Sequence, residues 1–223
     1  MKDIHLAIIL DGNRRFAKKL IKEPWKGHVL GSQKLEKLIQ WCLKDKIKEL
    51  TLYCFSLENF NRPKKEFDFL MNLFKKEAKK LKKDPRLKKH KIKINFIGKK
   101  ELLNPELQQL ITEIEAQTKN NSNFAINFAI AYGGRQEIIQ AIKNLIKSKK
   151  EINEQNFKEN LWLSNEPDLI IRTGGEKRTS NFLPWQSTYS EWIFLDKMWP
   201  EFIEEDFQNC LAEFKDRKRR FGK

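Results

Sequence analysis

The sequence predicts an α/β fold: a single domain with a central, mostly parallel six-stranded sheet flanked by helices. Six short apolar runs have the length of strands, and segments with helical spacing separate them. Most of these runs are continuous rather than alternating, which is typical of strands covered on both faces. No repeat or Gly/Ser-rich linker interrupts the 223 residues, so we expect one domain over residues 1–223.

The elements follow from apolar spacing. The expected strands are Ile4–Leu10, Leu50–Ser56, Ile92–Ile97, Phe124–Ile130, Leu169–Arg172 and Trp192–Leu195. The clearest helix follows Pro63, where apolar residues recur at steps of three and four from Phe67 to Leu81. Similar spacing predicts helices over roughly 29–46, 101–118, 134–148 and 203–216.

Composition excludes several classes of protein. A hydrophobic fraction of 39% with 16 Phe provides enough apolar side chain for a folded core, which excludes bulk disorder. The three cysteines are widely spaced and show no metal-ligand pattern, as in a reduced compartment. The apolar run at 6–10 is too short for a signal peptide or a membrane span. We therefore expect a soluble, cytoplasmic protein.

The net charge of +15 predicts an anionic partner: nucleic acid, an acidic membrane surface or a diphosphate. No zinc-finger spacing or aromatic RNA-binding pattern is present, which makes nucleic acid the weaker option. A non-catalytic basic protein that binds membrane or nucleic acid remains the alternative from a different class. It would bind with a steep salt dependence and without any need for Asp11.

Polar turns follow four of the predicted strands, at residues 11–15, 56–63, 131–135 and 172–178, and all but the second contain glycine. In open parallel sheets, ligands bind outside the carboxyl ends of the strands. The sequence therefore predicts a site at this edge of the sheet.

The first turn carries groups suited to a metal and a phosphate. Asp11 at a strand end can hold a hard cation, and Gly12 lets the backbone approach a phosphate closely. An Asx-turn that merely ends the strand is the structural alternative. Arg14, Arg15 and His28 add three potential phosphate donors.

A second set, Arg172, Arg178 and Ser180, suits bidentate recognition of a diphosphate, although Arg172 could instead form a structural ion pair. Glu191 could complete a magnesium site with Asp11, because Mg²⁺ usually takes only one or two protein carboxylates.

Five segments, in order along nearly the whole chain, resemble the motifs of the cis-prenyltransferase family, the undecaprenyl diphosphate synthases. They are residues 5–16, 53–63, 132–135, 168–176 with the continuation through Arg178, and 180–191 with Ser180-Asn181-Phe182, Trp185-Gln186 and Glu191. The resemblance implies a Mg²⁺-dependent homodimeric enzyme that adds isopentenyl diphosphate repeatedly to an allylic starter such as farnesyl diphosphate. The implied product is undecaprenyl diphosphate, the lipid carrier precursor for cell-wall glycans, with other chain lengths left open.

The resemblance also implies residue roles. Asp11 would bind Mg²⁺ with Glu191 as a second ligand, and Asn59 occupies the position often assigned to proton removal. The residues implied around the starter are Gly12, Asn13, Arg14, Arg15, Phe16, His28, Ser56, Leu57, Glu58, Phe60 and Arg62. Those implied around isopentenyl diphosphate are Arg172, Arg178, Thr179 and Ser180. Arg220-Phe221-Gly222 matches an ending that crosses the dimer interface in the family.

Two further expectations concern the substrates. The product requires a hydrophobic tunnel between sheet and helices, for which we expect walls from Phe67, Met71, Phe74, Leu52, Cys54, Ile126 and Phe128. Plain core packing is the alternative for these residues. The family commonly has a diphosphate-binding Arg where this chain has Pro24, so either Lys22 or Lys26 substitutes or affinity for the starter is lower. Contact with the inner face of a membrane would fit the positive charge.

Overall fold

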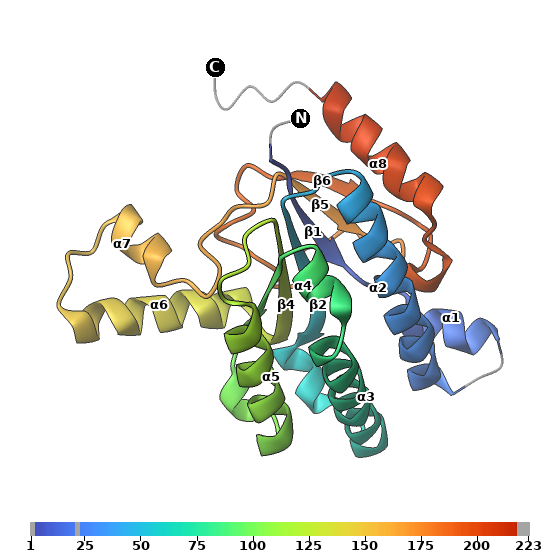
Figure 1. Cartoon of the computed structure of the whole chain (residues 1–223), viewed down its shortest axis with the longest axis horizontal. Helices are drawn as coiled ribbons and strands as arrows, with labels where there is room; N and C mark the ends of the chain where they lie inside the picture. Colours follow the sequence, from blue (N-terminus) through green and yellow to red (C-terminus); the bar gives the residue numbers. More distant parts are fainter. Residues whose placement is uncertain (1–2, 21–22, 218–223) are drawn as a thin grey trace.

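A parallel sheet of six strands forms the centre of the molecule, in the order β3-β4-β2-β1-β5-β6 (Figure 1). The computed structural model describes residues 3–20 and 23–217. The strands are β1 (His5–Ile9), β2 (Glu49–Ser56), β3 (Ile92–Ile97), β4 (Phe124–Tyr132), β5 (Leu169–Arg172) and β6 (Glu191–Phe194). The predicted α/β class is confirmed, and within the described residues every strand pair is parallel.

Helices connect the strands on both sides of the sheet. They are α1 (Asn13–Lys19), α2 (Gly27–Lys44), α3 (Lys64–Lys82), α4 (Pro85–Lys89), α5 (Pro105–Thr118), α6 (Gly134–Ser148), α7 (Glu154–Glu159) and α8 (Glu204–Asp216). The helix predicted from residue 101 begins at Pro105, because the Asn104 side chain accepts a hydrogen bond from the Leu107 amide and caps it there. None of the helices in the described ranges is long and apolar enough to cross a bilayer.

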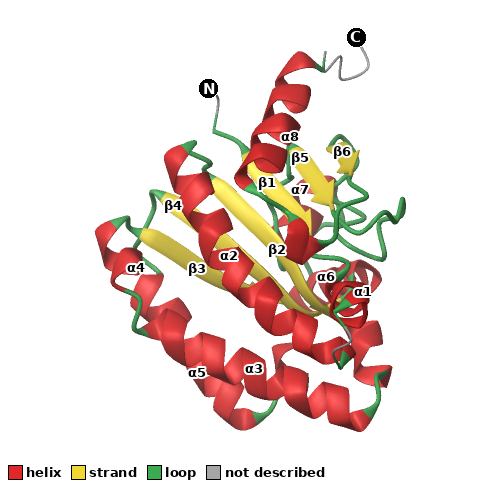
Figure 2. Cartoon of the chain, turned by 90° about the vertical axis from the view of Figure 1, so that its right-hand side faces the viewer, coloured by secondary structure: helices red, strands yellow, loops and turns green. Residues whose placement is uncertain are grey.

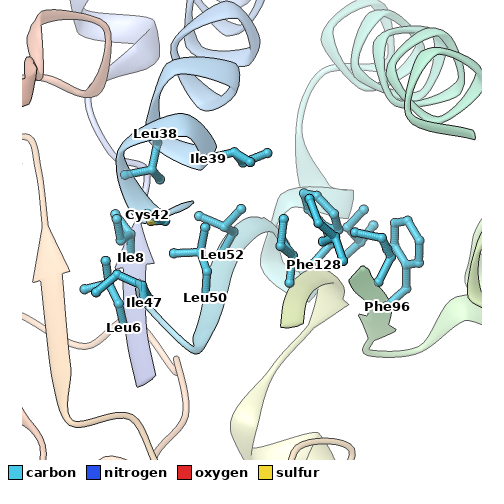
Figure 3. Packing of buried hydrophobic residues seen from close by; sticks show 14 of the residues in the cluster. Leu6, Ile8, Leu38, Ile39, Cys42, Ile47, Leu50, Leu52, Phe96 and Phe128 are labelled. Atoms are coloured by element: carbon cyan, nitrogen blue, oxygen red, sulfur yellow. The ribbon is translucent and has the colours of Figure 1, made fainter. Parts of the chain in front are cut away.

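The sheet separates two apolar layers. Leu6 and Ile8 of β1 face the layer under α2, α3, α5 and α8, while the alternate residues Ala7 and Ile9 face the opposite layer. Figure 3 shows Leu38 of α2 above the strand residues of the first layer. Figure 2 shows α2 lying across the sheet, with α3 and α5 beside it. The first layer is the one that contains the cavity described below.

Gly98, directly after β3, is a position where the fold requires glycine. Its φ is +126°, and a Cβ added there would lie 2.1 Å from the carbonyl oxygen of Ile130. The adjacent Lys99 amide donates to the carbonyl of Ala131, so the turn is held against the end of β4. A side chain at Gly98 would push this turn away from the strand that it supports.

We therefore expect Gly98→Ala to lower the free energy of unfolding by about 3 kcal/mol, from backbone strain plus the clash. Gly175→Ala is the matched control: its φ is +77°, but the nearest atom to the added Cβ is 3.5 Å away. Gly175→Ala should lower the free energy of unfolding only through backbone strain, by about 1 kcal/mol. Urea denaturation of both variants measures the difference, and equal losses would contradict the clash with Ile130.

Candidate active site

The turn between β1 and α1 places a carboxylate at the carboxyl edge of the sheet. Gly12 has a φ of +100°, and a Cβ there would lie 2.7 Å from Met198 Cβ, so only glycine fits. The Gly12 amide donates to Asp11 Oδ1 at 2.6 Å, while the Asn13 side chain donates to the carbonyl of Leu10 at 2.9 Å. The first contact fixes the direction of the Asp11 side chain, and the second ties the start of α1 to the end of the strand.

Asp11 is joined to an arginine from the neighbouring strand. Arg172 Nη2 donates to Asp11 Oδ2 at 2.7 Å, and Arg15 Nη2 lies 3.4 Å from Asp11 Oδ1. The other end of the Arg172 guanidinium donates to Ser180 Oγ at 2.8 Å and to the carbonyl of Arg178. Its Nε is buried with no partner in the described part of the chain. Arg172 is thus held rigidly, with one donor still unsatisfied.

A second cationic cluster lies across the same cleft, around Glu66 in the first turn of α3. Arg62 Nη1 contacts Glu66 Oε1 at 2.9 Å, and Arg14 Nη2 lies 3.5 Å from Glu66 Oε2. The Glu66 side chain is only 2% exposed. Sequence reasoning missed Glu66, although its i,i+4 spacing from Arg62 was a usable signal.

His28 belongs to this cluster as a neutral imidazole. Burial, together with the positive charges of Arg62 and Arg14, lowers its pKa to about 4. Its Nε2 is buried and has no partner among the described residues. A buried ring nitrogen between two arginines is available to an anionic ligand.

Asn59 lies in the short 3-10 helix Leu57–Asn61 after β2. Its Oδ1 accepts a hydrogen bond from the Ser56 amide at 3.2 Å, which fixes the amide group at the mouth of the cleft. The neighbouring Glu58 Oε1 accepts from Asn181 Nδ2 at 3.1 Å. An amide is a poor base, so this geometry suits positioning better than proton removal.

A cavity of about 1200 Å³ begins at these groups and continues between α2 and α3. The predicted site residues on its wall are Asp11, Gly12, Asn13, Arg14, Arg15, His28, Ser56, Glu58, Asn59, Arg62, Arg172, Thr179 and Ser180. Lys18 also lines it and was not predicted. Thirteen predicted residues from distant segments of the sequence therefore share one cleft.

The apolar wall differs in part from the prediction. Phe74, Cys54 and Phe128 line the cavity as expected. The other expected wall residues, Phe67, Met71, Leu52 and Ile126, pack in the adjoining core instead. The remaining apolar wall comes largely from α2, α3 and α5, through Leu35, Ile39, Leu70, Leu73, Ala78, Leu81 and Leu107.

Several predicted starter and diphosphate residues do not line the cavity: Phe16, Leu57, Phe60 and Arg178. Phe60 packs its ring against Phe55, with centroids 5.2 Å apart. The Arg178 side chain contacts Glu176 at 2.6 Å and is 62% exposed, so only its carbonyl touches Arg172. Of the proposed substitutes for the arginine missing at Pro24, Lys26 contacts Glu23, and Lys22 lies outside the described residues.

The structure does not place Glu191 beside Asp11 within a single chain, so a metal shared by the two remains a prediction. Glu191 begins β6 beside Leu169, at the opposite edge of the sheet, whereas Asp11 follows the end of β1. The register separates them by about 16 Å along the strand direction. Glu191 Oε2 instead accepts a hydrogen bond from Arg217 Nη1 at 2.7 Å. The Arg220-Phe221-Gly222 ending lies outside the described residues.

Asp11 alone fits a magnesium ion that takes most of its ligands from substrate and water. Its side chain is 30% exposed on the cavity wall, and its oxygens are bound by a backbone amide and two arginines. Mg²⁺ needs only one or two carboxylates when a diphosphate supplies the rest. The described residues contain no cluster of three or more His, Cys, Asp or Glu side chains that could hold a metal without substrate.

Comparison with known proteins identifies the group to which this cleft belongs. Residues 9–222 match the prenyltransferase family model described as "Putative undecaprenyl diphosphate synthase". The chain belongs to this family. It is therefore a prenyltransferase, as the motifs at the strand ends predicted.

Curated relatives and solved structures support the assignment over the full length. The chain is 44% identical to a geranylgeranyl-diphosphate-specific tritrans,polycis-undecaprenyl-diphosphate synthase of Thermococcus kodakarensis, covering 98% of this chain and 86% of the relative. It is 42% identical to an isoprenyl transferase of Thermus thermophilus, with 98% and 88% covered. A probable undecaprenyl diphosphate synthase from Campylobacter jejuni superposes with a TM-score of 0.86 at 35% identity over 100% of both chains. A lavandulyl diphosphate synthase from Lavandula x intermedia, bound to dimethylallyl diphosphate, reaches 0.92 at 34% over 98% of both chains.

The environment of His28 predicts a pH effect on stability. Its pKa is about 4 in the folded protein and about 6.5 in the unfolded chain. Below pH 6.5 the unfolded chain therefore binds a proton that the native state does not, so acid favours unfolding. Between pH 6.5 and 4 wild type should lose about 3 kcal/mol more than His28→Gln, measured by urea denaturation at each pH. A His28 resonance that titrates near 6.5 in the native protein would contradict this.

Proposed function

We propose that this prenyltransferase condenses isopentenyl diphosphate repeatedly onto an allylic diphosphate, with Mg²⁺, to give a long cis-polyprenyl diphosphate. One observation carries the proposal: a cavity with an apolar wall begins at Asp11 and five basic side chains, Arg14, Arg15, His28, Arg62 and Arg172. Such a shape matches a molecule with a diphosphate head and a long hydrocarbon tail. The prenyltransferase family assignment is consistent with it.

The two cationic clusters support two diphosphate sites. The group around Glu66 would hold the starter, and Arg172 with Ser180 would hold isopentenyl diphosphate. Asp11 lies in contact with Arg172 and Arg15, so it can hold a cation between the two diphosphates. When bound, magnesium supplies positive charge against the departing diphosphate.

The reaction balances with these groups. The C1–O bond of the starter breaks, its electrons leave with the diphosphate, and the double bond of isopentenyl diphosphate forms the new bond to C1. A proton is then lost from the isopentenyl unit and a new double bond forms. The arginines stabilise the leaving charge, which is the largest contribution expected from preorganised donors. Asn59 orients the nucleophile, and a diphosphate oxygen is the proton acceptor that we favour.

We propose undecaprenyl diphosphate as the product, supported by the names of the relatives from Thermococcus kodakarensis and Pyrococcus abyssi. Those names also specify a geranylgeranyl starter, whereas the resemblance of the motifs suggested farnesyl diphosphate. The assay below therefore compares both starters. The lavandulyl diphosphate synthase of the same fold shows that the fold alone does not determine the product.

A homodimer is part of the proposal. Ile139, Ile142 and Ile146 recur along α6 and are 53%, 39% and 65% exposed. Three large apolar side chains on one exposed helix face are typical of a protein interface. A two-fold dimer would bury this face against the same face of a second copy.

Asp11→Asn should lower the rate of isopentenyl incorporation by at least about 100-fold, because the charge that balances the arginines and binds the cation is lost. The measurement is transfer of labelled isopentenyl diphosphate into extractable lipid, with either starter, with Mg²⁺ or with EDTA. Glu205→Gln removes an exposed acid from α8 and should leave the rate unchanged. Folded wild type that incorporates no label with either starter would refute the proposed reaction and favour the non-catalytic alternative.

Ile146→Asp should convert the dimer to monomer, because burying a carboxylate in an apolar interface is costly. The mass from light scattering should fall to that of one chain. Ile203→Asp, at an exposed isoleucine directly before α8, is the matched control and should remain dimeric. A wild-type mass of one chain at assay concentration would refute the dimer.

A further inference from the structure

The cavity does not end inside the protein. At the end remote from Asp11, its wall changes from apolar side chains to the charged residues Glu36, Glu77, Lys80 and Asp84. The Lys80 and Glu36 side chains are 59% and 37% exposed, so this end reaches the surface. The cavity therefore has a second mouth, between α2 and α3.

An ion pair crosses this second mouth. Glu36 of α2 contacts Lys80 of α3, and Ser32 Oγ of α2 donates to Glu77 Oε1 of α3 at 3.5 Å. Exposed ion pairs are weak, because water screens them and ordering two long side chains costs entropy. The mouth can therefore open without breaking packed core.

The size of the cavity is comparable to that of a long product. An apolar cavity of about 150 Å³ accepts one six-carbon ring. By that ratio, the 1200 Å³ available here accepts roughly 48 carbons. An undecaprenyl chain has eleven five-carbon units, and part of the cavity must also hold the diphosphates. The distal end of such a chain would therefore reach the second mouth.

Lysines concentrate around this mouth. Residues 75–93 contain eleven Lys and Arg but only two acidic residues, the largest imbalance in the chain. One row on α3, Lys75, Lys79 and Lys82, pairs with Glu106 and Glu113 of α5 and is structural. We define the exit face as the other row, Lys76, Lys80 and Lys83, with Lys88 of α4.

Positions 76, 80 and 83 share one side of α3, because they are four and three residues apart. In this row only Lys80 has an ion-pair partner within the described ranges. Lys76, Lys83 and Lys88 are exposed. The exit face therefore offers free positive charge directly beside the point where the cavity opens.

We propose that the mouth between Glu36 and Lys80 is an exit for the distal end of the prenyl chain, and that the exit face docks it on an anionic lipid bilayer. The proposal rests on the proposed function above. Each prenyl unit that leaves the cavity into water loses the free energy gained by burial, whereas a bilayer provides an apolar environment. Lysines near the surface of an anionic bilayer are attracted to it. The bilayer thus completes the apolar path that the cavity begins.

Binding to vesicles tests the exit face. The triple variant K76Q/K83Q/K88Q leaves Lys80 and the cavity wall intact. At low salt it should bind phosphatidylglycerol/phosphatidylcholine vesicles roughly 100-fold more weakly than wild type, since each lysine contributes about fivefold. K149Q/K150Q/K215Q removes the same charge from exposed lysines after α6 and in α8, outside the exit face and the proposed dimer face, and should bind like wild type. Equal weakening of both variants would overturn a specific exit face.

Product length tests the exit itself. Without vesicles, all three proteins should incorporate isopentenyl diphosphate at the same rate and give the same products. With anionic vesicles, wild type and the control variant K149Q/K150Q/K215Q should shift to longer chains, and K76Q/K83Q/K88Q should not. The exit is overturned if K76Q/K83Q/K88Q incorporates isopentenyl diphosphate normally and still gives longer chains with vesicles. It is also overturned if this variant loses affinity for single-stranded RNA but not for vesicles. Absence of incorporation in wild type would refute the proposed function instead.

Discussion

The structure must keep several guanidinium groups close together around one open cleft while no anion is bound there. Like charges so close repel one another strongly where water is partly excluded. Carboxylates reduce the repulsion: Asp11 lies between Arg172 and Arg15, and Glu66 between Arg62 and Arg14. Each pair leaves donors unused, so a diphosphate finds its partners already oriented and little reorganisation is needed on binding.

These pairs exist because of the register of the sheet. Ile9 of β1 lies beside Arg172 of β5, which brings the residues that follow both strands to one edge. The same parallel register takes Glu191 to the other edge, where Arg217 neutralises it. The parallel register thus assembles the anion site and places Glu191 away from it within one chain. In the proposed reaction, a cation bound within a single chain would rely on Asp11 and on substrate oxygens.

Sequence reasoning predicted the sheet and its polar edge because both are recorded in local patterns. Continuous apolar runs mark buried strands, and the turn residues that follow them identify the edge. Three features were beyond such patterns. The helices α1, α4 and α7 are too short to show a period, and a carboxylate such as Glu66 looks like any surface residue of α3 until its burial is known. The contribution of α2 to the cavity depends on how helices pack, which apolar spacing does not specify.

The pairing of β1 with β5 also determines when the protein can become functional. Asp11 and Arg172 are separated by 161 positions, and β1 lies between β2, the next strand in the sequence, and β5, which is made much later. Contacts between such distant segments form slowly, because a long loop must close before it gains any stabilisation. During synthesis the Asp11 carboxylate must wait for most of the chain to emerge. The active site is therefore assembled late in folding, and a truncated chain would lack it even where its first strands had formed.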